Sequence, residues 1–170
     1  MTSPNSPLDP EKQPALVRVD VYEEWRKRQG VPLVGGVYIK DMKEVEVGPW
    51  PRKGDGVNGA LCYLDGDDEG DEHIVELPPG ASTAPLRHMY TEATYVVSGH
   101  GSTSVWRDNG AKQTFEWGPG SYFVLPTNAW HQFFNASLSR SARWFSVTDL
   151  PQLLRQWASH LAMPIFLAGP

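Results

Sequence analysis

Three side chains that bind metal ions well, His88, Glu92 and His131, stand in two short segments of the sequence. In residues 80–99, His88 precedes Glu92 by four positions, so a short connection between strands could bring both into one cavity. In residues 120–135, His131 begins an expected strand after a proline turn. Imidazole and carboxylate groups are common ligands of transition metals. If both segments line one barrel, these residue types favour a metal site.

The other ligand types narrow the chemistry. The single cysteine, Cys62, excludes an internal disulfide and any metal cluster held by thiolates alone. That usage fits a reducing compartment. The first residues carry neither a basic start nor an apolar core, and no apolar run approaches the ~18 residues of a membrane span. We therefore expect a cytoplasmic protein without a membrane partner.

The composition is that of one globular β domain. The chain has 170 residues, of which 40% are hydrophobic and 21% charged, and its net charge of -5 argues against nucleic acid as a partner. Its 16 glycines and 15 prolines are spread along the sequence, and 11% of the residues are aromatic. Many short strands joined by tight turns have this composition. It predicts an all-β sandwich or barrel.

The chain divides into four expected parts: a loose tail at 1–15, a helical arm at 16–33, a β-barrel at 34–148, and a helix with a tail at 149–170. Alternating hydrophobicity predicts strands over residues 34–40, 44–47, 60–64, 73–77, 93–97, 101–107, 112–117, 122–125, 131–135 and 142–147. The sequence Asp108-Asn109-Gly110 indicates a hairpin, because Asn-Gly readily adopts positive φ angles. The acidic stretch 65–70 only approximates a calcium loop, and we expect a solvated hairpin tip there.

Both terminal helices carry apolar surface. Asp20 can cap a short helix that bears Trp25, and a second helix is expected to begin near residue 150. The apolar residues of the two are Trp25, Leu153, Leu154 and Trp157. Because such surface is rarely left exposed, we expect a homodimer in which the N-terminal segment packs on the neighbour's sheet. In the alternative, both segments fold back on their own barrel.

The first ligand-bearing segment resembles the first motif of the cupin superfamily. That motif reads Gly, five residues, His, one, His, three or four, Glu, six, Gly. Gly80, His88, Glu92 and Gly99 keep its register, whereas Leu86 stands where the family usually has its first histidine.

The second segment resembles the second cupin motif, which reads Gly, five residues, Pro, one, Gly, two, His, three, Asn. Gly120, Pro126, His131 and Asn135 keep its register. Asn128 replaces the middle glycine, and asparagine also accepts left-handed backbone geometry.

This resemblance implies a double-stranded β-helix, a jelly-roll barrel, with its site inside the mouth. It leaves His88, Glu92 and His131 as a two-histidine, one-carboxylate ligand set, which is the ligand chemistry of non-haem Fe(II) oxygenases. A divalent metal is therefore expected. Fe(II) is favoured, and Zn, Mn or Ni would suit the same ligands. In the alternative, the leucine at position 86 abolishes metal binding, and the three residues only form hydrogen bonds at the mouth.

The resemblance implies an enzyme acting on a small organic molecule, with a dioxygenase-type oxidation favoured. A non-redox metal-dependent isomerase, cyclase or lyase and a non-catalytic small-molecule-binding cupin are the alternatives. Leu86 would shape the pocket beside the metal. Tyr95, Phe123 and Phe133 are the expected substrate contacts, although aromatic residues on strands often only pack.

For the remaining candidate residues, structural or surface roles are the simpler interpretation. Three histidines outside both motifs, His73, His100 and His160, are expected to be solvated or locally hydrogen-bonded. Arg87 is expected on the surface, and Gln132 should face away from its neighbour His131 by strand alternation. Further aromatic residues that could line a pocket are Trp106, Trp117 and Trp130, and Tyr90 could anchor a substrate group beside His88.

Overall fold

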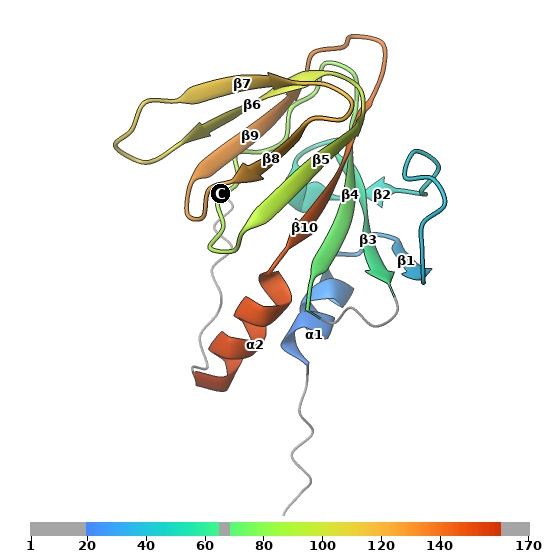
Figure 1. The fold of residues 1–170 in the computed structure, drawn as a ribbon, viewed down its shortest axis with the longest axis vertical. Coiled ribbons are helices and arrows are strands. Elements are labelled where there is room, and N and C mark those ends of the chain that lie inside the picture. Colours follow the sequence, from blue (N-terminus) through green and yellow to red (C-terminus); the bar gives the residue numbers. More distant parts are fainter. Residues whose placement is uncertain (1–19, 65–68, 161–170) are drawn as a thin grey trace, which may run out of the picture.

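Two β-sheets face each other and enclose a core, and two short helices lie together at one end (Figure 1). The structure, a computed structural model, describes residues 20–64 and 69–160. Its strands are β1 (Leu33–Gly36), β2 (Gly48–Pro49), β3 (Asn58–Leu64), β4 (Asp71–Leu77), β5 (Glu92–Ser98), β6 (Gly101–Trp106), β7 (Gln113–Trp117), β8 (Tyr122–Leu125), β9 (Trp130–Asn135) and β10 (Ala142–Thr148). Its helices are α1 (Val21–Arg28), the short 3-10 helix η2 (Pro51–Lys53) and α2 (Leu150–His160). The expected all-β jelly-roll barrel with short terminal helices is confirmed.

The sheet topology brings distant parts of the sequence together. The larger sheet has the order β1-β3-β4-β10-β5-β8, with β2 paired to β3, and the smaller sheet has the order β7-β6-β9. All pairings are antiparallel except that between β1 and β3. Strand β10 therefore lies between β4 and β5, although it follows both in the sequence by many residues.

The main core fills the space between the two sheets. It consists of alternate residues that point inward from both sheets, as period-two side-chain alternation requires. Its buried members are Trp50, Val57, Leu61, Val75, Leu77, Val96, Trp117, Leu125, Phe133, Ala142 and Trp144. The rings of Phe133 and Trp144 stack across the two sheets with centroids 4.5 Å apart.

A second cluster covers the outer face of β3 and β4. Buried Ala60, Cys62 and Ile74 pack there against the segment 37–47, which crosses over the sheet. The guanidinium of Arg143 fastens this segment by donating hydrogen bonds to the carbonyls of Met42, Lys43 and Val45 at 3.0, 2.7 and 3.0 Å.

The strands predicted over 34–40 and 44–47 are largely wrong. Strand β1 ends at Gly36, and the next pairing occurs only at β2. The alternating apolar residues of this segment reflect its packing over the outer face of the sheet and not a ladder of its own.

The predicted hairpin joins β6 to β7, but its turn is different from the one expected. The amide of Gly110 donates to the carbonyl of Arg107 at 2.9 Å, and neither Asn109 nor Gly110 has a positive φ.

Asn128, in the second motif, has a positive φ of 60°, as its place in that motif predicted. Gly99 also requires its glycine, because its φ is 84° and a Cβ would collide with the backbone of Ala142.

The two helices fold back on their own barrel. Asp20 caps α1 by accepting hydrogen bonds from the amides of Tyr22 and Glu23. Tyr22 packs with Tyr90, and with Leu150 and Leu154 of α2, in one buried cluster. Arg155 and Asp20 form an ion pair of 3.0 Å between the helices.

The side chains named for the expected dimer interface pack mostly on their own chain. Trp25 packs against the main core and against the cluster of Tyr22 and Tyr90 in its own chain, and Leu154 is buried in that same cluster. Leu153 is partly buried in the same cluster, and only Trp157 remains exposed, at 44%. The homodimer itself stays a prediction.

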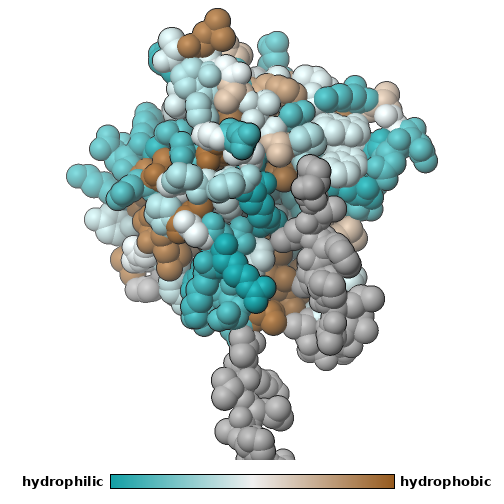
Figure 2. Space-filling view, turned by 180° about the vertical axis from the view of Figure 1, so that it is seen from behind, coloured by the Kyte–Doolittle hydropathy of each residue, from teal (hydrophilic) through white to brown (hydrophobic). Residues whose placement is uncertain are grey.

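Several segments for which the sequence made predictions lie outside the described residues. The tail at 1–15, the tip at 65–68 and the end of the chain at 161–170 fall outside them. No helix in residues 20–64 and 69–160 has the length and apolar character that a membrane crossing needs. Figure 2 shows hydrophilic residues over much of the rear face, with apolar residues in smaller groups between them.

Asn135, the last residue of the second motif, gives a prediction about stability. Its side-chain amide donates to the carbonyls of Leu77, Pro78 and Arg140 at 3.0, 2.9 and 2.8 Å, and its oxygen accepts from the amide of Ser137. Asn135→Ala would leave buried carbonyls without a donor, so we expect the free energy of unfolding to fall by about 2–3 kcal/mol. Urea denaturation measures this loss. The exposed Asn109→Ala should change it by less than about 0.5 kcal/mol, and an equal effect of both would contradict the role of Asn135.

Candidate metal centre

Backbone pairing brings the two ligand-bearing segments together. Leu86 and His131 exchange hydrogen bonds between their amides and carbonyls at 2.9 and 2.8 Å, which adds the segment before β5 to the edge of β9. The amide of Asn128 then donates to the carbonyl of His88 at 2.8 Å. Glu92 opens β5 in the other sheet. His88 and His131 therefore face Glu92 from the opposite side of the barrel interior.

The three side chains converge on one point. One ligand atom from each of His88, Glu92 and His131 lies within 4.8 Å of the others. The shortest separation, 3.0 Å, is between Nε2 of His88 and Oε2 of Glu92. Two ligands bound at right angles to a metal at about 2.1 Å lie about 3 Å apart, so this separation suits a shared ion. All three residues are buried, with 5%, 1% and 1% of their surfaces exposed.

The outer nitrogens of both imidazoles point at backbone carbonyls. Nδ1 of His88 donates to the carbonyl of Tyr90 at 2.8 Å, and Nδ1 of His131 faces that of Ala129 at 3.4 Å. Such bonds fix the Nδ1–H tautomer and leave Nε2 as the coordinating atom. In His88 that atom faces a carboxylate oxygen, so a cation, either a proton or a metal ion, must lie between them. The residues therefore fit a divalent metal.

The charge states of His131 and Glu92 also suit metal binding. Burial lowers the pKa of His131 to about 4, so its imidazole is neutral near pH 7 and able to bind a metal. Burial alone would raise the pKa of Glu92, but Lys53, His73 and His88 together hold it well below its ordinary value. Glu92 is therefore a buried carboxylate that stays ionised.

His73 takes part in this arrangement: of the two expected surroundings, solvent or a local hydrogen bond, it has the local hydrogen bond, to Asp71. It is buried on β4, with Nε2 3.5 Å from Oε1 of Glu92 and Nδ1 3.0 Å from Oδ2 of Asp71. Burial and Lys53 act to lower the pKa of His73, but the hydrogen bonds to Asp71 and Glu92 outweigh them and raise it. Tyr22 of α1 donates to Oδ1 of Asp71 at 2.8 Å.

The sequence offered a signal for His73 but none for its partners. Period-two alternation along 73–77 places His73 on the inward face with Val75 and Leu77. Lys53 ends the short 3-10 helix η2 and Asp71 begins strand β4, so nothing in their local sequence ties them to residue 92. Their roles depend on the pairing of β4 with β10 and of β10 with β5.

Strand register arranges the inner face of the larger sheet in rows. Across β4, β10 and β5, the first row is Asp71, Thr148 and Glu92; the second is His73, Ser146 and Thr94; the third is Val75, Trp144 and Val96. All nine are buried. The barrel interior is thus polar at the end near the helices and apolar beyond it.

Aromatic rings lie on the apolar side of the centre. The rings of His131 and Phe133 meet edge to face at 6.3 Å, those of Phe133 and Phe123 lie 6.0 Å apart, and those of Phe123 and Phe115 4.9 Å. Phe115 was not among the expected contacts, yet it shares the inward side of β7 with Trp117. Leu86, the register partner of His131, is partly buried.

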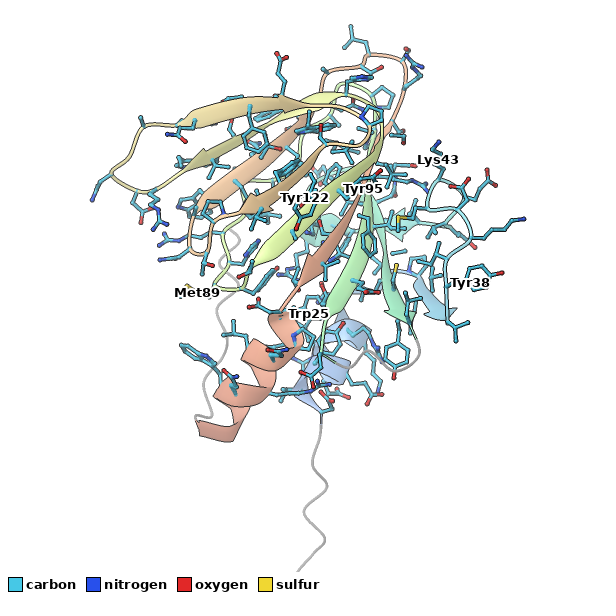
Figure 3. All side chains as sticks on the ribbon, in the orientation of Figure 1. Trp25, Tyr38, Lys43, Met89, Tyr95 and Tyr122 are labelled. Carbon is cyan, nitrogen blue, oxygen red and sulfur yellow. The ribbon has the colours of Figure 1, made fainter. Side chains whose placement is uncertain are left out.

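Tyr95 does not join the other expected substrate contacts. It alternates with inward Thr94 and Val96 on β5, is 45% exposed, and pairs with Tyr122 on the outer face (Figure 3). The period-two rule applied from Glu92 already places it outside. Its assignment to the pocket is therefore wrong.

The remaining candidates form structural contacts. The indoles of Trp106 and Trp130 stack on each other, Arg87 pairs with exposed Asp108 at 2.9 Å, and Trp117 belongs to the core. Gln132 donates to the carbonyl of Thr83.

The two other histidines outside the motifs and Tyr90 lie in different surroundings. His100 is exposed, as expected, and the side chain of His160 lies outside the described part of the structure. Tyr90 is buried, with its ring stacked on that of His88 at 3.8 Å. It therefore supports the candidate ligand.

Comparisons with known proteins agree with this architecture. Residues 73–148 match the family profile described as a cupin domain. A 5-aminosalicylate 1,2-dioxygenase from Comamonas sp is 40% identical to this chain over 75 residues, which are 44% of this chain and 18% of that protein. The chain thus matches less than a fifth of the length of this curated relative.

Solved structures share the fold at low identity. A Lactobacillus farciminis oxalate decarboxylase in a formate complex has a TM-score of 0.54 and 18% identity, covering 74% of this chain and 42% of that one. The cupin domain of Schizosaccharomyces pombe Cnp3 has a TM-score of 0.50 and 14% identity, covering 64% and 66%. Both motifs lie within residues 73–148, the part of the chain that matches the cupin domain profile, and this part resembles cupin domains in sequence and in fold.

Proposed function

We propose that this chain is a metal-dependent cupin enzyme that oxidises a small organic molecule with O₂, using Fe(II) held by His88, Glu92 and His131. The observation that carries the proposal is the convergence of two imidazoles and one carboxylate within 4.8 Å in a buried site. Two histidines and one carboxylate leave open positions on Fe(II) for substrate and O₂. The 40% identity to a dioxygenase over 75 residues supports the same reaction class.

The surrounding residues have distinct roles in this proposal. His88 and His131 would hold the metal through Nε2, since their Nδ1 atoms face backbone carbonyls. Glu92 would supply Oε2, the oxygen that faces His88. Leu86 and Phe133 exclude water beside His131, and the ring of Phe123 offers an apolar surface for a planar substrate. Bound Fe(II) supplies the one-electron chemistry that spin-forbidden reactions of O₂ require.

The relative's printed name suggests the first compound to test. 5-Aminosalicylate is a small aromatic molecule, and the rings of Phe123 and Phe133 fit an aromatic substrate class. A dioxygenase places both atoms of O₂ in its product. We therefore expect one O₂ consumed for each molecule of substrate lost, as measured with an oxygen electrode on anaerobically Fe(II)-loaded protein. If the protein instead binds Zn and converts substrate without taking up O₂, the proposed oxidation is wrong and a non-redox metal enzyme is favoured.

Removal of any one ligand should abolish metal binding. His88→Ala, Glu92→Ala and His131→Ala are each expected to lower the metal content of protein purified without added metal by at least about tenfold, because two ligands cannot retain the ion. Elemental analysis measures the metal content, and circular dichroism verifies the fold. His100→Ala removes an exposed histidine and should retain the metal. A fully loaded His131→Ala protein would contradict the assignment.

Leu86→His tests the open position beside His131. The two residues are register partners, so a histidine at position 86 would add an imidazole on the same side of the pocket. We expect about tenfold slower metal loss to a chelator, together with lower activity, because a fourth protein ligand fills a position that substrate or O₂ needs. Leu86→Met, of similar volume, should leave metal loss unchanged. Higher activity in Leu86→His would show that Leu86 is not beside an open position.

A further inference from the structure

A buried lysine contacts the carboxylate of the candidate metal centre. Lys53, the last residue of η2, is only 8% exposed. Its Nζ lies 3.9 Å from Oε1 of Glu92 and 3.3 Å from Nε2 of His73. Lysine side chains are rarely buried unless paired, because their charge is costly to remove from water. Glu92 is the nearest anionic partner that the structure gives to this ammonium group.

The fold fixes the position of Lys53 from several sides. Its amide donates to the carbonyl of Trp50 at 2.9 Å, and its carbonyl accepts from the amide of Ala84 at 2.8 Å. Ala84 belongs to the segment that leads through Leu86 to His88. The ammonium also lies 5.2 Å from the ring centroid of Trp50, within range of a cation–π contact. Lys53 is therefore held against the centre by the same backbone that carries one of its ligands.

The two oxygens of Glu92 face different cations. Oε2 lies 3.0 Å from Nε2 of His88, on the side where the metal would bind. Oε1 lies on the side of Lys53 and His73. Glu92 therefore offers one oxygen to a metal ion, while the other stays with Lys53.

We propose that Lys53 is the internal counter-ion of Glu92 in the metal-free protein and that it weakens metal binding at the same carboxylate. This inference rests on the proposed function, because it assumes that Glu92 is a ligand. A buried carboxylate without a positive partner is strongly destabilising, so Lys53 supports the metal-free fold. Once a divalent ion is bound, the same ammonium lies close to a like charge in a poorly screened site. Lys53 therefore stabilises the empty barrel and opposes its loading.

The sign of this effect makes it testable with Lys53→Met. Methionine keeps much of the side-chain length without its charge. We expect the metal-free variant to melt several degrees lower than the unaltered protein. We also expect its Kd for Zn(II), measured by competition with a chromogenic chelator, to be about tenfold tighter. Damage that is merely structural would weaken both, so a less stable protein with tighter zinc binding is specific to the counter-ion role.

Two controls separate charge at this site from other effects. Lys53→Arg keeps the positive charge and should bind Zn(II) within about threefold of the unaltered protein. Lys40→Met removes the same charge from an exposed residue and should change neither the melting temperature nor the zinc affinity. Zinc affinity equal to or weaker than normal in folded Lys53→Met protein would overturn the proposal.

If Lys53→Met alone does not fold, a double variant that combines it with Glu92→Gln still tests the counter-ion role. Adding Glu92→Gln removes the carboxylate that has lost its ammonium partner, so the double variant should be more stable than Lys53→Met. A double variant no more stable than Lys53→Met would overturn the counter-ion role. Absence of Zn(II) and Fe(II) binding in the unaltered protein would instead overturn the proposed function, while leaving this comparison of metal-free stabilities valid.

Discussion

The carboxylate of Glu92 is held ionised with 1% of its residue surface exposed, and the polar end of the barrel is organised around that charge. Transfer of an ionised group out of water is tolerated only with charged or hydrogen-bonding partners. His88 supplies one partner at Oε2, and Lys53 and His73 lie at Oε1. Two of these three residues, Lys53 and His73, lie outside both cupin motifs. The contacts of the centre therefore extend beyond the two motifs.

This constraint extends to the N-terminal helix. His73 is oriented by Asp71, and Asp71 accepts a hydrogen bond from Tyr22 on α1. Tyr22 and Lys53 both precede residues 73–148, the part that matches the family profile. The region before the matched domain therefore takes part in the electrostatics of the centre, in addition to covering the end of the barrel (Figure 1).

The strongly periodic parts of the fold were predictable from the sequence, and the long-range contacts were not. Alternation located β3 to β10 because each has one face in the core. It failed over 37–47, where apolar residues pack on the outer face of β3 and β4. His88, Glu92 and His131 could be singled out because their spacing follows a known pattern. Lys53 could not, because its contact with Glu92 depends on where η2 packs in the barrel, which the local sequence does not determine.

The central position of β10 has a consequence for synthesis on the ribosome. Its residues, 142–148, join β4 to β5 in the larger sheet, so neither of those strands has its final neighbour until the barrel's last strand has been made. Before β10 exists, the edges of β4 and β5 that face it carry backbone N–H and C=O groups without their strand partner. Folds dominated by such non-local pairing form slowly and expose unpaired edges while they wait. Pairing of β10 also places Thr148 between Asp71 and Glu92, so the polar row of the centre requires this strand.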